Sequence, residues 1–262
     1  MNSPDDPSPN VDLCRLGTGH GPIALVCLPY AGGGTSIYRS WPKALPGVAV
    51  YALGLPGREG RLAEEPFAEI GALVAATAAA ILTVGPEPYA LFGHSMGALV
   101  AFETARRLRH QDAVAPAHLF VSGFRAPHLP DPKPPLHDLP HARFIDELRR
   151  INGDAFDPDG HSELLELMLP TLRADFRLVQ TYAYRAEPPL VSPITAFGGL
   201  GDTDVDEQQL LGWRRHTSAS FALKLFPGGH FFLQTAADNL LKEIGLRLNP
   251  QPTNPSWRSR ET

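Results

Sequence analysis

Cysteine is scarce in this chain: its 262 residues include only two, Cys14 and Cys27. So few thiols exclude a small scaffold held together by disulfides, and Cys27 lies in an apolar run typical of a buried strand. The sequence contains neither a C-x-x-C pair nor an H-E-x-x-H pattern, so no motif supports a metal site. We expect a cytoplasmic protein with no bound metal and no cofactor.

Long apolar runs and a surplus of positive charge are also missing. No stretch approaches the roughly 20 apolar residues of a membrane span, and no basic segment followed by an apolar one marks a signal peptide. The net charge of −5 argues against a nucleic-acid partner. The hydrophobic content of 43% is enough for one large core. The Pro- and Asn-rich ends, residues 1–12 and 249–262, are expected to be disordered.

Short apolar runs alternate with helical segments through much of the chain. This rhythm predicts an α/β fold, with a mostly parallel sheet covered by helices on both faces. Loops that carry function should then lie at the carboxyl ends of the strands. The predicted strands are residues 23–28, 48–53, 89–92, 118–122, 193–198 and 221–226. The main predicted helices are residues 66–84, 98–110, 206–216 and 231–248.

One segment breaks this rhythm. Residues 127–140 are rich in proline, and three helices are predicted to follow without a strand between them, over residues 142–151, 162–169 and 170–182. We interpret residues 127–188 as a helical lid inserted into the core, which comprises residues 13–126 and 189–248.

The most informative stretch is residues 89–100, which is predicted to form a strand, a sharp turn and a helix. Its turn, Gly93-His94-Ser95-Met96-Gly97, fits G-x-S-x-G, the nucleophile elbow. The turn is so tight that small residues are needed on both sides of the serine. Ser95 would then be exposed at the end of a strand, next to the free N–H groups of a helix. His94 is too close along the chain to act as its base.

A serine nucleophile needs a base and a group that orients the base. In α/β-hydrolases the chain order is serine, acid, histidine. His230 follows Pro-Gly-Gly after the last predicted strand and fits the base. Asp202 fits the acid in G-x-x-D-x-x-V, while Asp204 in the same loop is the alternative.

The oxyanion of an acyl intermediate needs N–H donors. The elbow supplies the N–H of Met96, and the loop Pro29-Tyr30-Ala31-Gly32-Gly33-Gly34 lies where such folds place the second donor. Ala31 is the predicted donor, with Tyr30 beside it. A phosphate-binding loop is excluded because no Gly-Lys-Ser/Thr follows the glycines.

Five blocks of the sequence carry a resemblance: residues 28–33, 55–59, 93–97, 169–176 and 226–232. Together they make the chain similar to a known family, the type II thioesterases that accompany polyketide synthases and non-ribosomal peptide synthetases. The resemblance implies the α/β-hydrolase fold, the triad Ser95, Asp202 and His230, and an oxyanion hole at Ala31 and Met96. The sequence departs from many relatives at Thr203, where they have a proline after the acid.

The resemblance also implies the substrate, an acyl group on the phosphopantetheine arm of a carrier protein. It implies that lid residues, including Leu172, Phe176 and Tyr182, shape the acyl chamber. Three charged residues of the blocks, Arg58, Arg173 and Asp175, are interpreted as structural salt bridges. Nothing in the sequence requires more than a monomer. The alternatives are a general esterase or acyl-CoA thioesterase, an acyltransferase, and a non-catalytic module that binds a carrier protein.

Overall fold

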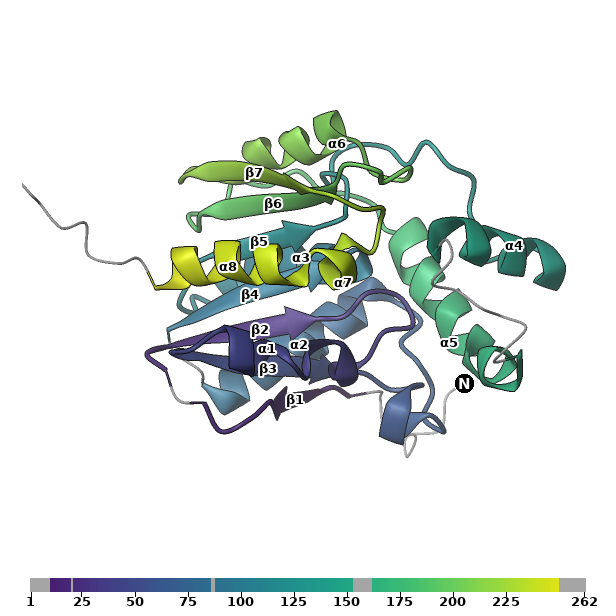
Figure 1. Ribbon diagram of the computed structural model, residues 1–262, viewed down its shortest axis with the longest axis horizontal. Helices are drawn as coiled ribbons and strands as arrows, with labels where there is room; N and C mark the ends of the chain where they lie inside the picture. Colours follow the sequence, from purple (N-terminus) through teal and green to yellow (C-terminus); the bar gives the residue numbers. More distant parts are fainter. Residues whose placement is uncertain (1–9, 20, 86–87, 153–161, 250–262) are drawn as a thin grey trace, which may run out of the picture.

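The computed structural model describes residues 10–19, 21–85, 88–152 and 162–249 (Figure 1). The predictions of disorder for residues 1–9 and 250–262 lie outside this part of the chain. Residues 10–12 are described, and Asp12 is already the first residue of a strand. The core therefore begins slightly earlier than the sequence indicates.

The centre of the molecule is a sheet of seven strands in the order β1-β3-β2-β4-β5-β6-β7. The prediction of a mostly parallel sheet is confirmed, since only β1 runs antiparallel to its neighbour β3. Strands β2 and β4 lie near the middle and are almost wholly apolar, as expected when helices cover both faces. The strands are β1 (Asp12–Arg15), β2 (Ile23–Leu28), β3 (Val48–Gly54), β4 (Tyr89–His94), β5 (Leu119–Ser122), β6 (Ile194–Gly199) and β7 (Phe221–Phe226).

Helices pack on both faces of the sheet, and alternate strand residues divide between the two cores (Figure 1). In β2, for example, Val26 faces α2 and α3, while Leu25 and Cys27 face α1 and α8. Both cysteines are free thiols. The helices are α1 (Trp41–Ala44), α2 (Ile70–Val84), α3 (Met96–His110), α4 (His141–Asn152), α5 (Ser162–Gln180), α6 (Glu207–Leu211), α7 (Phe232–Thr235) and α8 (Ala237–Leu248).

The sequence missed strand β1 and misplaced several helix boundaries. β1 carries a charge at each end and no apolar run, so it is recognised only by its pairing along the edge of β3. Helix α2 begins at Ile70 rather than residue 66. The closing helix is divided at Ala236 into α7 and α8.

Helix α5 replaces two of the predicted helices and continues through Pro170. A proline inside a helix costs about 3 kcal/mol. The same helix buries Leu169 and Leu178, and each buried leucine contributes roughly 1.5–3 kcal/mol. Pro170 itself is exposed, so water can reach the carbonyl that lacks its helical partner. Tertiary packing therefore outweighs the local preference of proline.

Helices α4 and α5, within the segment 127–188, lie at the end of the sheet where β2 and β4 terminate (Figure 1). The residues that follow α5 run along α3 instead, where Glu187 pairs with Arg106 and Arg109. Helices α4 and α5 share a small apolar cluster that includes Phe144, Leu148 and Leu169. Leu178, near the end of α5, belongs instead to the core beneath the sheet. Helix α5 thus connects this segment firmly to the rest of the fold. No helix in the described ranges is long and apolar enough to cross a membrane.

Burial of His216 predicts a loss of stability in mild acid. The ring lies against Phe102 and Trp213, and burial lowers its pKa to about 4. The unfolded chain binds this proton near its ordinary pKa of about 6.5, so the free energy of unfolding should fall as pH drops from about 6.5 to about 4. Urea unfolding at pH 7 and pH 5 would measure this, and His216→Phe should make the difference smaller. Equal pH dependence in both proteins would contradict the assignment.

Candidate active site

Ser95 occupies a strained turn between β4 and α3. Its φ of 52° and ψ of −120° are rarely adopted by a residue with a side chain. A Cβ on Gly93 would lie 2.0 Å from the carbonyl oxygen of Gly97, and a Cβ on Gly97 would lie 2.2 Å from that of Leu28. Only glycine fits at either position, which explains the G-x-S-x-G spacing. The Ser95 N–H donates to the Ser122 carbonyl at 2.7 Å and holds the turn against β5.

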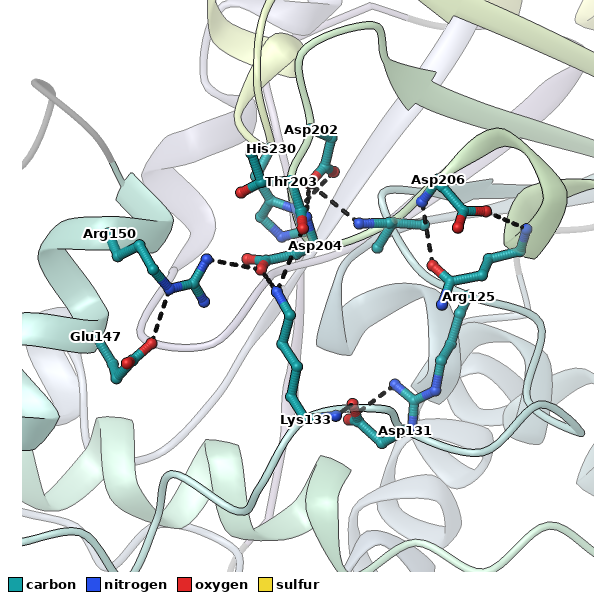
Figure 2. Close-up of polar contacts among 12 residues, drawn as sticks. Arg125, Asp131, Lys133, Glu147, Arg150, Asp202, Thr203, Asp204, Asp206 and His230 are labelled. Carbon is teal, nitrogen blue, oxygen red and sulfur yellow. Dashed lines mark hydrogen bonds and ion pairs between the residues drawn. The ribbon is translucent and has the colours of Figure 1, made fainter.

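The structure brings Asp202 and His230 together beyond the ends of β6 and β7. Oδ2 of Asp202 lies 2.9 Å from Nδ1 of His230 (Figure 2). The Asp202 side chain is 0% exposed and that of His230 is 9% exposed. The other carboxylate oxygen of Asp202 accepts the N–H groups of Asp204 at 2.8 Å and Val205 at 3.2 Å. The acid is therefore aimed at the histidine by its own loop, and Ser95 and His230 line one cavity.

Asp204 has different partners. It forms ion pairs with Lys133 and, at 3.0 Å, with Arg150 from the last turn of α4 (Figure 2). Asp202, Asp204 and His230 offer ligand atoms within 4.8 Å of one another, which resembles a metal cluster. The ion pairs already explain the position of the Asp204 carboxylate. The Asp202–His230 hydrogen bond explains the positions of Asp202 and His230. The geometry separates the two candidate acids: Asp202 contacts the imidazole, and Asp204 holds the lid segment.

The glycine-rich loop after β2 leaves one N–H group free near Ser95. The Gly32 N–H donates to Asp175 at 2.7 Å, and the Gly33 N–H donates to the Tyr30 carbonyl at 2.9 Å. The Ala31 N–H donates to no group in the described ranges, and Ala31 lines the same cavity as Ser95. Met96 is the first residue of α3, where N–H groups have no partner within the helix. Within the described ranges, neither of the two predicted oxyanion donors donates to another backbone group outside the helices and strands.

A cavity of about 450 Å³ adjoins these groups. Tyr30, Leu172 and Phe176 line it. Tyr182 does not belong to the lining residues, because α5 ends at Gln180 and the chain then turns toward α3. Its hydroxyl donates to Glu103 at 2.6 Å instead. The lid contributes most of the apolar wall, through Leu136, Leu148, Ile151, Leu165, Met168, Leu172, Phe176 and Val179.

His94 lies buried behind the catalytic edge of the sheet. Its Nδ1 is 2.9 Å from Oγ of Ser122, and its ring centroid is 5.2 Å from that of His230. Burial and the neighbouring His230 hold the pKa of His94 well below its ordinary value. It therefore remains neutral in the folded protein. Its partner Ser122 carried no motif that could have marked it in the sequence.

A hydroxyl, an imidazole oriented by a buried carboxylate, and two free N–H groups beside an apolar cavity are the parts required for acyl transfer through an acyl-serine. Residues 24–248 match the family described as "Thioesterase domain". The chain belongs to the thioesterase family. Because this match includes β2 to α8, the whole catalytic edge of the sheet is shared with the family.

Individual relatives identify the type of thioesterase to which this chain belongs. It is 43% identical to the linear gramicidin dehydrogenase LgrE of Brevibacillus parabrevis, over 87% of this chain and 88% of that protein. It is 41% identical to the gramicidin S biosynthesis protein GrsT of Aneurinibacillus migulanus, over 87% and 91%. The structure of the type II thioesterase BorB from the borrelidin biosynthetic cluster superposes with a TM-score of 0.83 at 35% identity, over 95% and 100%. The chain is a type II thioesterase.

Substitution of the two aspartates in this thioesterase should separate their roles. Asp202→Asn should lower kcat by about 10³–10⁴-fold, because His230 loses the acceptor that orients its Nδ1–H. Asp204→Asn should lower it less than about tenfold, because half-exposed ion pairs contribute little. Steady-state hydrolysis of one acyl thioester, with circular dichroism as a folding check, would measure both. Equal losses would show that the hydrogen bond to His230 does not define the acid.

Proposed function

We propose that this type II thioesterase hydrolyses acyl thioesters on the phosphopantetheine arm of carrier proteins, and so removes aberrant or stalled groups from a polyketide or non-ribosomal peptide synthase. The observation that carries the proposal is the apolar cavity that begins at Ser95 and His230 and is walled by the lid. Such a cavity suits an acyl chain attached to a thioester at the serine. The names of GrsT and BorB, which belong to gramicidin S and borrelidin biosynthesis, support the setting.

Each residue has one role in the proposed reaction. Ser95 Oγ attacks the thioester carbonyl carbon while Nε2 of His230 takes its proton. The N–H groups of Ala31 and Met96 donate to the oxyanion of the tetrahedral intermediate. The C–S bond then breaks, and His230 protonates the thiolate of the departing arm. Asp202 keeps the imidazole in the required tautomer.

Water completes the cycle by the same steps. His230 deprotonates the water as it attacks the acyl-serine carbonyl, and then returns the proton to Ser95 Oγ as the ester bond breaks. The products are a free carboxylic acid and a carrier protein with a free thiol. Tyr30, Leu172 and Phe176 are proposed to hold the acyl chain, since they line the cavity beside Ser95.

The proposed setting is a cytoplasmic monomer whose lid, residues 127–188, covers the site. One chain supplies the nucleophile, the base, the acid and both oxyanion donors, so catalysis needs no second copy. The lid is joined to the catalytic loop through Arg150 and Asp204 and to the core through α5. Substrate entry is therefore proposed to involve α4 and the proline-rich segment more than α5.

The test compares one acyl group on a carrier protein and on free coenzyme A. Intact-protein mass spectrometry would follow deacylation of the carrier by the wild type and by Ser95→Ala. We expect Ser95-dependent loss that is much faster from the carrier than from coenzyme A. Similar slow rates on both would indicate a general thioesterase or esterase. Transfer of the acyl group to an added alcohol or amine, in place of release as an acid, would indicate an acyltransferase.

A further inference from the structure

The oxyanion loop, defined here as residues 29–36, has little regular structure of its own. It contains three consecutive glycines and ends in a single 3-10 turn, Thr35–Tyr38. Glycines lose more conformational freedom on folding than other residues, so such a loop is poorly defined by its own sequence. Because this loop carries the Ala31 N–H, other parts of the fold must hold the loop in place.

Asp175 of α5 holds the first half of the loop. Its Oδ2 accepts the Gly32 N–H at 2.7 Å, one residue from Ala31. The same carboxylate receives both terminal nitrogens of Arg58, at 2.7 Å and 3.0 Å. Arg58 also donates to the Gly33 carbonyl at 3.2 Å. The side chains of Arg58 and Asp175 are 3% and 2% exposed, so this pair is shielded from solvent.

Glu59, the neighbour of Arg58, holds the second half of the loop. Its two carboxylate oxygens accept the N–H groups of Thr35 at 3.0 Å and Ser36 at 2.9 Å, and the Thr35 hydroxyl at 2.7 Å. These hydrogen bonds overcome the cost of desolvation and lower the pKa of Glu59 to about 2. Glu59 is therefore ionised at neutral pH. Its φ of 51° shows that its backbone is strained to make these contacts.

The glycines of the loop are explained by the same contacts. Gly32 has a φ of 75°, and a Cβ there would lie 2.5 Å from Leu172 of α5. A Cβ on Gly34 would lie 2.3 Å from the carboxylate carbon of Glu59. The glycines allow α5 and Glu59 to approach the loop backbone closely. Arg58, Glu59 and Asp175 do not themselves belong to the residues that line the active-site cavity.

We propose that Arg58, Glu59 and Asp175 are positioning residues that preorganise the oxyanion hole, by fixing the loop backbone on both sides of the Ala31 N–H. This inference rests on the proposed acyl-serine mechanism. It changes the interpretation of Arg58 and Asp175 from structural salt bridges to parts of the catalytic apparatus. It also assigns a role to Glu59, for which the sequence offered none.

Glu59→Gln is the first test, because Glu59 is an exposed residue whose replacement should leave the protein folded. The amide keeps one acceptor but turns an NH₂ group toward the N–H groups of the loop. Asp175→Asn has the same effect beside Gly32. Because misplaced donors cost about 10²-fold in rate, we expect kcat to fall between about 10- and 100-fold, with KM nearly unchanged.

An alkyl boronic acid provides a second readout. Its boron binds Ser95 Oγ and forms a tetrahedral adduct whose oxygen occupies the oxyanion hole, so its affinity reports the donors directly. Both variants should bind it more weakly by a factor similar to the loss in kcat. Affinity for the carboxylic acid product, which forms no tetrahedral adduct, should change little. A purely structural role would leave the ratio of the two affinities unchanged.

The matched control is Glu187→Gln. Glu187 pairs with Arg106 at 2.6 Å, and Arg106 is as buried as Arg58, but the pair lies away from Ser95. The control should lower the unfolding temperature while kcat stays within about twofold. The double variant Arg58→Met with Asp175→Leu removes both buried charges, which commonly restores stability. Its kcat should remain low, because the Gly32 N–H still lacks its acceptor.

Normal kcat and boronic acid affinity in folded Glu59→Gln and Asp175→Asn would overturn the inference. Recovery of kcat together with stability in the double variant would overturn it as well. Failure of the proposed function has a different signature: the wild type would then show no Ser95-dependent release from carrier protein. The boronic acid measurement still applies in that case. If the wild type did not bind the boronic acid through Ser95, the oxyanion hole itself would be excluded.

Discussion

The rest of the site depends on the close backbone packing at Gly93 and Gly97, on either side of Ser95. Their Cα atoms pass so close to carbonyl groups of the turn and of Leu28 that no side chain fits. The contact places the strained Ser95 at the centre of the sheet, between the loops that follow β2 and β5. Because neighbouring parallel strands end at the same edge, the loops after β6 and β7 bring Asp202 and His230 to the same place. The catalytic geometry is thus a consequence of sheet topology.

A second feature of the structure is the set of ion pairs that join the lid to the core. Removal of one member of a buried ion pair costs about 3–5 kcal/mol, so Asp175 and Arg58 bind α5 strongly to the oxyanion loop. Asp204 makes a more exposed connection to Lys133 and Arg150, at the opposite side of the cavity. One of these two charged sets is thus buried, and the other is more exposed.

The predictions from sequence succeeded where local patterns carry the information and failed where packing decides. All six predicted strands, β2 to β7, lie within two residues of the observed bounds, since their apolar runs are bounded by turns. Strand β1 has no such run, and α5 passes through a proline that local preference would place at a helix start. The resemblance implied that Tyr182 shapes the acyl chamber, but the chain turns away after Gln180 and the Tyr182 hydroxyl donates to Glu103 of α3. No local pattern could assign a role to Glu59, because its partners Thr35 and Ser36 lie 24 and 23 residues away along the chain.

By itself, the sequence determined the fold class, the nucleophile elbow and the candidate set of acid, base and oxyanion donors. These follow from short-range patterns, in which glycines, a serine or a histidine occupy fixed offsets from an apolar strand. Only the tertiary structure decided between Asp202 and Asp204, which are two residues apart in one loop. Asp202 is directed at His230 because its second oxygen is held by the N–H groups of Asp204 and Val205, whereas Asp204 is drawn to Lys133 and Arg150. Those cations come from residues more than 50 positions away along the chain, so no local pattern could contain the choice.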